Sequence, residues 1–176
     1  MSHTNLIVTL MSDDKPGIVS QVAKTIAEHN GNWLDSHMVQ LAGKFTGLLR
    51  IDVPDTSMTA LSNDLKALST QGIDTLIEQE KPLAEPLGNI AVHFELSGPD
   101  RKGIVSEISK AFSIVGMSID KMQTHCSSTP WSGEPLFEAK GVLLTSSATP
   151  LDALQDNLQQ IQDELGLDIT LSTPSP

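Results

Sequence analysis

Short runs of alternating apolar and polar residues open each half of the chain. Alternation with a period of two is typical of a β-strand with one buried face. The positions that share the buried face are Leu6, Val8 and Leu10 in the first run, and Val92, Phe94 and Leu96 in the second. On the opposite face of the first strand, Ile7 and Met11 are also apolar. We therefore expect that face to pack on another sheet, within the chain or in a dimer.

Apolar residues at helical spacing follow each of these strands. The stripes are Val19, Val22 and Ile26 in the first half, and Val105, Ile108, Phe112 and Val115 in the second. The first helix is expected to begin at Pro16, and Gly31 and Gly116 are expected to cap the helix ends. A second helix in each half is predicted by longer stripes: Met58, Leu61, Leu65 and Leu68, then Leu151, Leu154, Leu158, Ile161 and Leu165 after Thr149 and Pro150.

The remaining periodic segments predict strands. They cover 32–41, 45–53 and 73–79 in the first half, and 118–126, 137–143 and 167–171 in the second. A short turn at 42–44 joins the first pair, and a longer polar turn at 127–135 joins the second. The order is β-α-β-β-α-β in each half. The predicted fold class is therefore α+β, with two ferredoxin-like units whose helices cover one face of an antiparallel sheet.

The two halves also repeat each other in sequence. An offset of 86 residues aligns Asp14 with Asp100 and Gly17 with Gly103. After one deleted residue, an offset of 85 aligns Gly31 with Gly116. The segment 82–89 holds two prolines and a glycine, which is typical of a linker. We predict a first domain at 1–81, a linker at 82–89 and a second domain at 90–176.

Composition excludes several classes of protein. The 176 residues carry 22 acidic and 11 basic side chains, a net charge of −11, so the basic face that phosphate contacts require is missing. Direct nucleic-acid binding is therefore not expected. The single cysteine excludes an internal disulfide and fits a reducing, cytoplasmic compartment. No signal peptide and no membrane-spanning apolar run are expected.

The segment between the first strand and the first helix carries the candidate chemistry. Its residues are Asp13, Asp14, Lys15, Pro16, Gly17 and Ile18. Helix capping by an Asp side chain, with Pro in the first turn, is a sufficient structural explanation for part of it. A functional explanation is that the helix N-terminus attracts a carboxylate, that Gly17 admits a ligand to the backbone, and that nearby Asp and Asn side chains accept from an ammonium group. A free amino acid carries both groups.

The motif D-x-P-G-I-V at 14–19, followed by G-N-W-L-D-S at 31–36, resembles the ACT domain. The resemblance covers both halves, roughly residues 4–173, and is closest in form to stand-alone chains of two such units. It implies that the first loop and Asn32 bind an amino acid. It also implies a second ligand loop, consisting of Asp100, Arg101, Lys102, Gly103 and Ile104. The second half departs from the motif, since Lys102 replaces the proline and Ser118 replaces the asparagine.

For such tandem chains, the resemblance implies an effector-responsive repressor of the glycine cleavage operon. The effector would be an amino acid, with glycine the first choice. Repression would act through contact with a DNA-bound LysR-type activator, and a homodimer is compatible with the open sheet faces. The alternative is a regulatory subunit of an amino-acid or one-carbon enzyme, because ACT units often accompany catalytic chains.

The sequence gives little support for an enzyme or a metal site. The five histidines show no pair at i,i+3 or i,i+4, so neither a metal nor another cofactor is expected. Cys126 stands beside His125, but neighbouring residues on a strand point to opposite faces. We interpret Cys126 as a small buried or half-buried hydrophobe rather than as a nucleophile.

Overall fold

The computed structural model describes residues 2–81, 90–129, 133–145, 159 and 161–172. The chain divides into two compact units, Met1–Pro82 and Leu83–Pro176, and each is treated by itself. The predicted linker at 82–89 lies outside the described residues.

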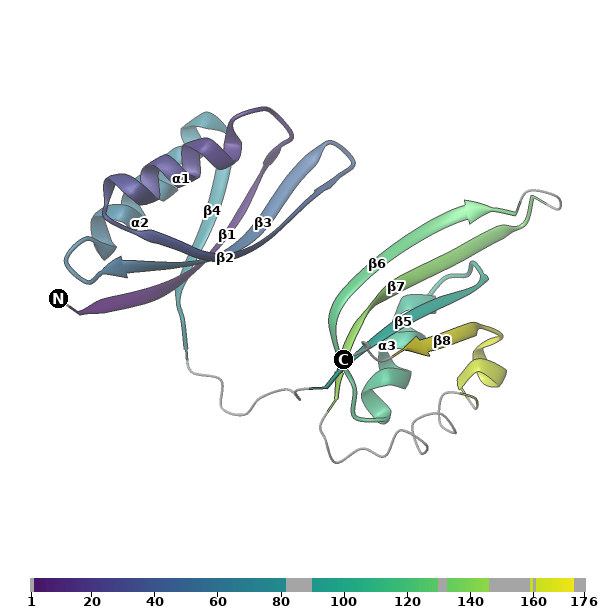
Figure 1. Ribbon diagram of the computed structural model, residues 1–176. Helices are drawn as coiled ribbons and strands as arrows, with labels where there is room; N and C mark the ends of the chain where they lie inside the picture. Colours follow the sequence, from purple (N-terminus) through teal and green to yellow (C-terminus); the bar gives the residue numbers. More distant parts are fainter. Residues whose placement is uncertain (1, 82–89, 130–132, 146–158, 160, 173–176) are drawn as a thin grey trace. The chain divides into compact units, whose positions relative to one another are not determined.

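Four strands, two α-helices and a short 3-10 helix build the first unit (Figure 1). In chain order they are β1 (His3–Asp13), α1 (Ile18–Glu28), β2 (Asn32–Leu41), β3 (Lys44–Pro54), α2 (Met58–Ala67), the short 3-10 helix η1 (Leu68–Gln71) and β4 (Ile73–Gln79). The sheet order is β2-β3-β1-β4, and every neighbouring pair is antiparallel. The predicted ferredoxin-like order of elements is confirmed.

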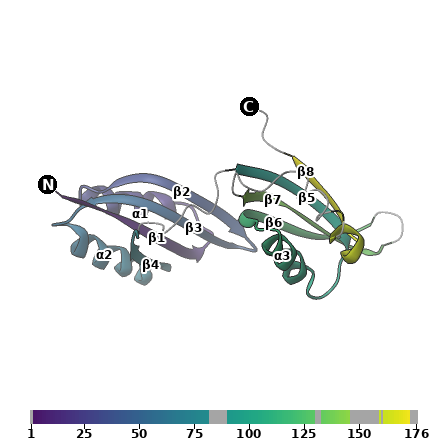
Figure 2. The same ribbon diagram turned by 90° about the horizontal axis from the view of Figure 1, so that it is seen from below.

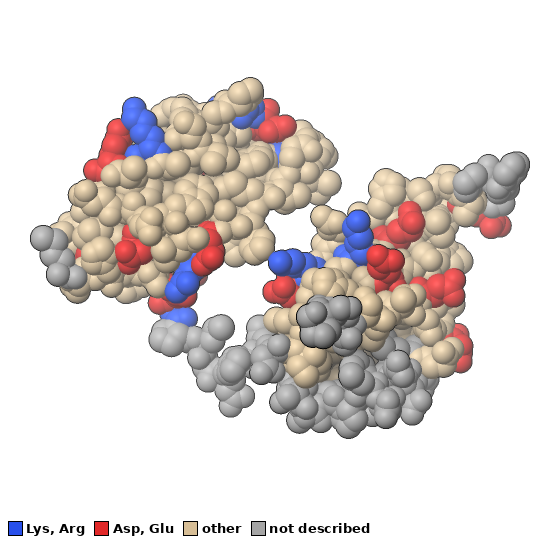
Figure 3. Space-filling model, viewed as in Figure 1, with Lys and Arg blue, Asp and Glu red and all other residues tan. Residues whose placement is uncertain are grey.

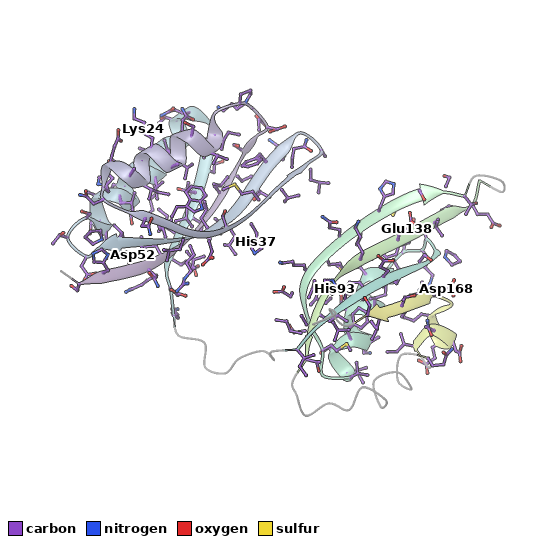
Figure 4. The ribbon with its side chains drawn as sticks, in the orientation of Figure 1. Lys24, His37, Asp52, His93, Glu138 and Asp168 are labelled. Atoms are coloured by element: carbon purple, nitrogen blue, oxygen red, sulfur yellow. The ribbon has the colours of Figure 1, made fainter. Side chains whose placement is uncertain are left out.

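The predicted apolar alternation places the core of the first unit between the sheet and its helices. Leu6, Val8 and Leu10 of β1 are buried, and they pack in one cluster with Ile26 of α1 and Leu65 of α2. Full burial of such aliphatic side chains contributes roughly 1.5–3 kcal/mol each to stability. Figure 4 shows Lys24 on the helix side of the sheet and His37 on the opposite side. That opposite side carries no helix and is called the first open face.

The second unit repeats this arrangement over its described residues. Its elements are β5 (Ile90–Pro99), α3 (Ile104–Ile114), β6 (Ser118–Ser128), β7 (Pro135–Thr145), a helical stretch at 161–165 and β8 (Asp168–Ser172). The sheet order is β6-β7-β5-β8, with α3 against one face (Figure 2). Phe94 and Phe112 meet in the core, with ring centroids 5.3 Å apart. Most of the predicted helix at 151–165 lies outside the described residues.

The ends of α1 differ from the prediction. The helix begins at Ile18 rather than at Pro16. At its C-terminal end, Asn30 takes the left-handed conformation with φ 58°, and the Gly31 N–H donates to the Ile26 carbonyl at 3.0 Å. Gly31 is not the left-handed residue; it is small because a Cβ there would lie 2.8 Å from Ile26 Cγ2. The structural counterpart of Gly116 (φ 76°) is therefore Asn30.

The predicted one-residue deletion between the halves is wrong. Asn30 and Gly116 are 86 positions apart, as are the bulges at Trp33/Asp35 in β2 and Ile119/Lys121 in β6. The length difference falls later, between β2 and β3 in the first unit and between β6 and β7 in the second. The connecting turn spans residues 42–43 in the first unit and 129–134 in the second, where the Thr129 N–H donates to the Glu134 carbonyl at 2.9 Å. β6 accordingly runs to Ser128, two residues beyond its predicted end.

Candidate ligand-binding loops

The first candidate loop joins β1 to α1 at one end of the first sheet. Asp13 is the last residue of β1 and lies opposite Lys44 of β3. The Asp14 N–H donates to the Gly43 carbonyl at 2.9 Å, so the loop is fixed to the turn between β2 and β3. Pro16 is exposed, whereas Ile18 is buried in the core. The side chain of Ile18 therefore cannot contact a ligand, and this residue can contribute only its backbone.

Gly17 makes the turn into α1. Its φ is 95°, a backbone region that side chains with a Cβ rarely adopt. No side chain hydrogen-bonds to the helix start, so the expectation that an Asp side chain caps α1 is wrong. A Cβ built on Gly17 would meet nothing within 4 Å. Gly17 is thus required by the turn, and the space in front of the helix N-terminus is open.

The Asp13 side chain is used elsewhere. Asp13 forms an ion pair with Lys44, and the hydrogen bond from that lysine holds the pKa of the Asp13 carboxyl below its usual value. The nearby charge of Lys15 acts in the same direction. Because both partners are largely exposed, this pair contributes little to stability.

Lys15 ties the loop to the end of the second helix. Its Nζ donates to the Gln71 carbonyl at 2.6 Å, and the Gln21 amide donates to the Gln71 side chain at 2.6 Å. An ammonium has three donors, and one is used here. Among the ion pairs of the described residues, none includes Lys15. The first loop therefore holds a cation with spare donors beside the positive end of α1.

The second candidate loop has the same backbone and different charges. The Asp100 N–H donates to the Pro135 carbonyl at 3.0 Å, and Gly103 has φ 89°. Ile104 is buried like its counterpart, and Lys102 is exposed. Arg101, however, forms an ion pair with Glu107 at 2.6 Å. This contact raises the pKa of Arg101 and lowers the pKa of Glu107, so the second loop's guanidinium is already compensated.

Asn32 does not join the first loop within its own unit. It is the first residue of β2 and lies opposite Asp52, which in turn lies opposite Asn5 near the start of β1. Asp13 is eight residue steps along β1 from Asn5. At about 3.4 Å per residue, Asn32 and the loop are roughly 27 Å apart along the sheet. One small ligand cannot contact both in the same unit.

Sequence reasoning missed Ser12, although the alternation of Leu6, Val8 and Leu10 extends to it. The residue is 5% exposed on the helix side of β1, directly before the loop, and its hydroxyl has no hydrogen-bond partner. In the second unit, Gly98 takes this place, and a Cβ there would lie 2.4 Å from Leu167 Cδ2. A buried hydroxyl beside the loop is therefore a property of the first unit.

Other chemistry finds little support in the described part of the chain. No group of three His, Cys, Asp or Glu side chains there could hold a metal. Cys126 is exposed, so its interpretation as a buried or half-buried hydrophobe is wrong. It lies on β6 opposite Phe137 of β7. Among the described helices, none has the length and apolarity needed to cross a membrane.

Known proteins that resemble this chain agree with the observed fold. An ACT domain family model matches residues 4–77. UPF0237 protein MK1213 of Methanopyrus kandleri is 32% identical over 80 residues, which cover 44% of this chain and 89% of that protein. Phosphoserine phosphatase SerB2 of Mycobacterium tuberculosis is 28% identical over 126 residues, which cover 68% of this chain and 30% of the phosphatase.

A solved structure resembles the whole chain. The crystal structure of a "putative glycine cleavage system transcriptional repressor" matches with a TM-score of 0.77 and 19% identity, and the match covers 100% of both chains. At that identity the match supports the fold, two ACT-type units in tandem, and not the activity. Together with the motif at the start of α1 and the observed sheet order, these matches place the protein in a family: the chain belongs to the ACT domain family.

Proposed function

We propose that the chain is a non-enzymatic regulatory protein that senses an amino acid at the first loop. Glycine is the preferred candidate for this amino acid. The observation that carries the proposal is the open N-terminus of α1 together with the buried Ser12 hydroxyl directly before that loop. The uncapped start of α1 and the spare donors of Lys15 suit a carboxylate. The unpartnered Ser12 hydroxyl and the Asp14 carboxylate offer acceptors for an ammonium group.

The second loop is the weaker candidate under this proposal. Arg101 is neutralised by Glu107, and Gly98 removes the hydroxyl that Ser12 supplies. The role of Asn32 would require the first loop of another copy, because its own loop is too distant. We therefore assign the primary site to 13–18 and treat the second loop as a secondary site.

We further propose that the effector signal is passed to a DNA-bound LysR-type activator of the glycine cleavage operon, in the cytoplasm. The net charge of −11 supports an indirect route. A protein without a basic face cannot neutralise DNA phosphates and release the counterions bound to them. The likeness to a chain named as a glycine cleavage repressor supports the choice of operon. No residue of this chain would contact DNA bases.

Calorimetric titration of the full chain with glycine tests the sensing step, with serine, alanine and acetate as comparison ligands. We expect binding of glycine and none of acetate, because acetate lacks the ammonium group. A gel-shift assay tests the second step. The chain alone should leave operator DNA unshifted at physiological salt and should alter the mobility of the activator–DNA complex. A titration without heat for any amino acid would contradict the sensing proposal.

A second candidate is a regulatory unit that acts on a metabolic enzyme. The match to 30% of the length of SerB2 favours it, because a sequence similar to this chain there forms part of a protein named as a phosphatase. The two candidates differ in the protein captured from cell extract by the immobilised chain. A transcriptional activator supports the first, and a metabolic enzyme supports the second.

A further inference from the structure

A closed ring of contacts joins the first loop to α1 and η1. Lys15 Nζ donates to the Gln71 carbonyl at 2.6 Å, and the Gln21 side-chain amide donates to the Gln71 side chain at 2.6 Å. The Gln21 N–H donates to the Gly17 carbonyl at 2.9 Å. Only Pro16 stands between Lys15 and Gly17 in the chain, so the ring closes through the loop itself.

The backbone of Gln71 suits a lysine because this residue ends η1. The last carbonyls of a helix have no donor within the helix and carry a partial negative charge, which an ammonium group neutralises. Gly72 follows with φ 77°, and a Cβ built on it would lie 3.8 Å from Lys15 Nζ. The Lys15 ammonium therefore lies over this helix end, and two of its three donors remain for a ligand.

Lys15 has no ionic partner to fix its side chain. In Figure 3, basic side chains on the visible side lie beside acidic ones in several places. Lys15 is exposed, and none of the ion pairs of the described residues includes it. A lysine that is ordered only by its ligand loses rotamer entropy on binding, and this loss weakens the affinity. The hydrogen bond to Gln71 orders the side chain before a ligand arrives.

Gln21 fixes Gln71 from the side of α1. Gln21 is half-buried in the first turn of that helix, whereas Gln71 is exposed. The hydrogen bond between the two side chains holds the last residue of η1 against α1, and that residue holds Lys15. The two glutamines thus act in series on one ammonium group, which they keep beside the start of α1.

The second unit has the same loop backbone without this ring. Glu107 takes the place of Gln21 at the offset of 86 residues. Leu165 takes the place of Gln71, because its carbonyl accepts from Arg101 at 3.4 Å. A leucine side chain cannot hydrogen-bond, and Glu107 pairs directly with Arg101 at 2.6 Å. The fold therefore does not require glutamine at either position.

We propose that Gln21 and Gln71 are positioning residues, which hold the Lys15 ammonium where the carboxylate of the ligand binds at the open start of α1. This inference rests on the proposed function, because it assigns a ligand to Lys15. The two glutamines raise the affinity without touching the ligand, since an ordered lysine loses less entropy on binding. Lys15 and the free N–H groups of the helix start then donate to the carboxylate together.

NMR relaxation of the Lys15 side chain in the full, unliganded chain tests the positioning step. We expect a higher order parameter for its ε-methylene group in the parent protein than in two variants. Gln71→Leu installs the residue of the second unit, and Gln21→Met keeps the stem and removes the amide. Gln79→Met is the control, because Gln79 is an exposed residue at the other end of β4, and it should leave the order parameter unchanged.

A chemical-shift titration with glycine tests the consequence for binding, since it measures weak affinities. Gln71→Leu and Gln21→Met should each weaken binding about threefold to tenfold, which is the effect of leaving one long side chain to be ordered by the ligand. Their melting curves should remain those of folded proteins. In a Lys15→Met background, Gln71→Leu should change the affinity less than about twofold, because Gln71 acts only through Lys15.

The outcomes distinguish this inference from the proposed function. A Lys15 side chain that is as mobile in the parent protein as in both glutamine variants overturns the positioning role, whether or not glycine binds. A loss of affinity in Gln71→Leu that persists in the Lys15→Met background overturns it too, because Gln71 then acts by another route. An ordered Lys15 in a chain that binds no amino acid overturns the proposed function, and the ligand assigned to Lys15 with it.

Discussion

Lys15 joins the loop before α1 to Gln71, the last residue of η1, at one end of the first unit's sheet. Lys15 Nζ donates to the Gln71 carbonyl at 2.6 Å, and in the second unit Arg101 reaches the Leu165 carbonyl at 3.4 Å in the same place. Both contacts link the strand–helix loop to the end of the second helical segment of the same unit. The difference lies in charge, since Arg101 has an acidic partner and Lys15 has none among the ion pairs of the described residues.

Replacing Lys15 by methionine should weaken glycine binding while the fold is retained. Methionine keeps the apolar stem and removes the charge. A hydrogen bond to a charged group contributes roughly 1.5–3 kcal/mol, which corresponds to about a 10- to 150-fold loss of affinity. Calorimetric titration measures the change. Arg101→Met is the matched control and should leave the affinity within about twofold of the parent protein. Equal losses in both variants would show that the first loop has no special role.

The fold followed from sequence because aliphatic alternation and helical stripes are strong and agree in both halves. At the C-terminal end of α1 the prediction failed because an asparagine takes the place expected for a glycine. Asn30 takes the left-handed position that a glycine was expected to hold, since a short polar side chain tolerates it. Some features of the candidate site depend on contacts between elements, which the hydrophobic periodicity of the sequence does not predict. The sheet register separates Asn32 from its loop, and the N-cap residue of α1 is Gly17, so no aspartate side chain caps the helix.

Replacing Gly17 or Gly103 by alanine should destabilise the protein by a similar amount. Both glycines have φ near 90°, and neither new Cβ would meet a neighbour closer than 3.9 Å. Backbone strain of about 1–2 kcal/mol is therefore the main cost in each case. Urea unfolding of the full chain measures it. We expect the glycine response to be lost more fully in Gly17→Ala, because only that loop has the uncompensated cation and the buried hydroxyl.

Acid should destabilise the protein through a small set of carboxyls. The pKa values of Asp13, Asp55, Glu80 and Glu107 are lowered, chiefly by hydrogen bonds from Lys44, Ser2, Asn5 and Arg101 respectively. A carboxyl with a lowered pKa in the folded state binds fewer protons there than when unfolded. Its stabilising effect is therefore complete above its ordinary value, 3.8 for Asp and 4.5 for Glu, and is lost as the pH falls below it.

Urea midpoints between pH 7 and pH 2.5 check this pH dependence. The midpoint should be level above about pH 5 and fall below it, and added salt should flatten the fall because these groups are exposed. Lys44→Gln should remove the part of this fall in the urea midpoint that is due to Asp13. Lys66→Gln, which removes a positive charge from the last turn of α2, is the control and should preserve the profile. A midpoint that rises as the pH is lowered would contradict the assignment.

Replacing Ser12 by alanine should separate stability from sensing. The Ser12 hydroxyl is buried without a partner, and an unsatisfied buried hydroxyl costs roughly 1–3 kcal/mol. Its removal should therefore raise the free energy of unfolding of the unliganded chain by about 1 kcal/mol. Because the hydroxyl is also our acceptor for the ligand's ammonium group, the increase in melting temperature on adding glycine should shrink.

Thr75→Val is the control for Ser12→Ala, because it removes another buried, unpartnered hydroxyl from the same unit. Thr75 lies opposite Leu10, two residues further from the loop than Ser12. Its replacement should also stabilise the unliganded chain, and it should leave the glycine response intact. If Ser12→Ala instead lowers the free energy of unfolding and keeps the response, the hydroxyl has a structural partner, and the ammonium group of the ligand must be recognised elsewhere.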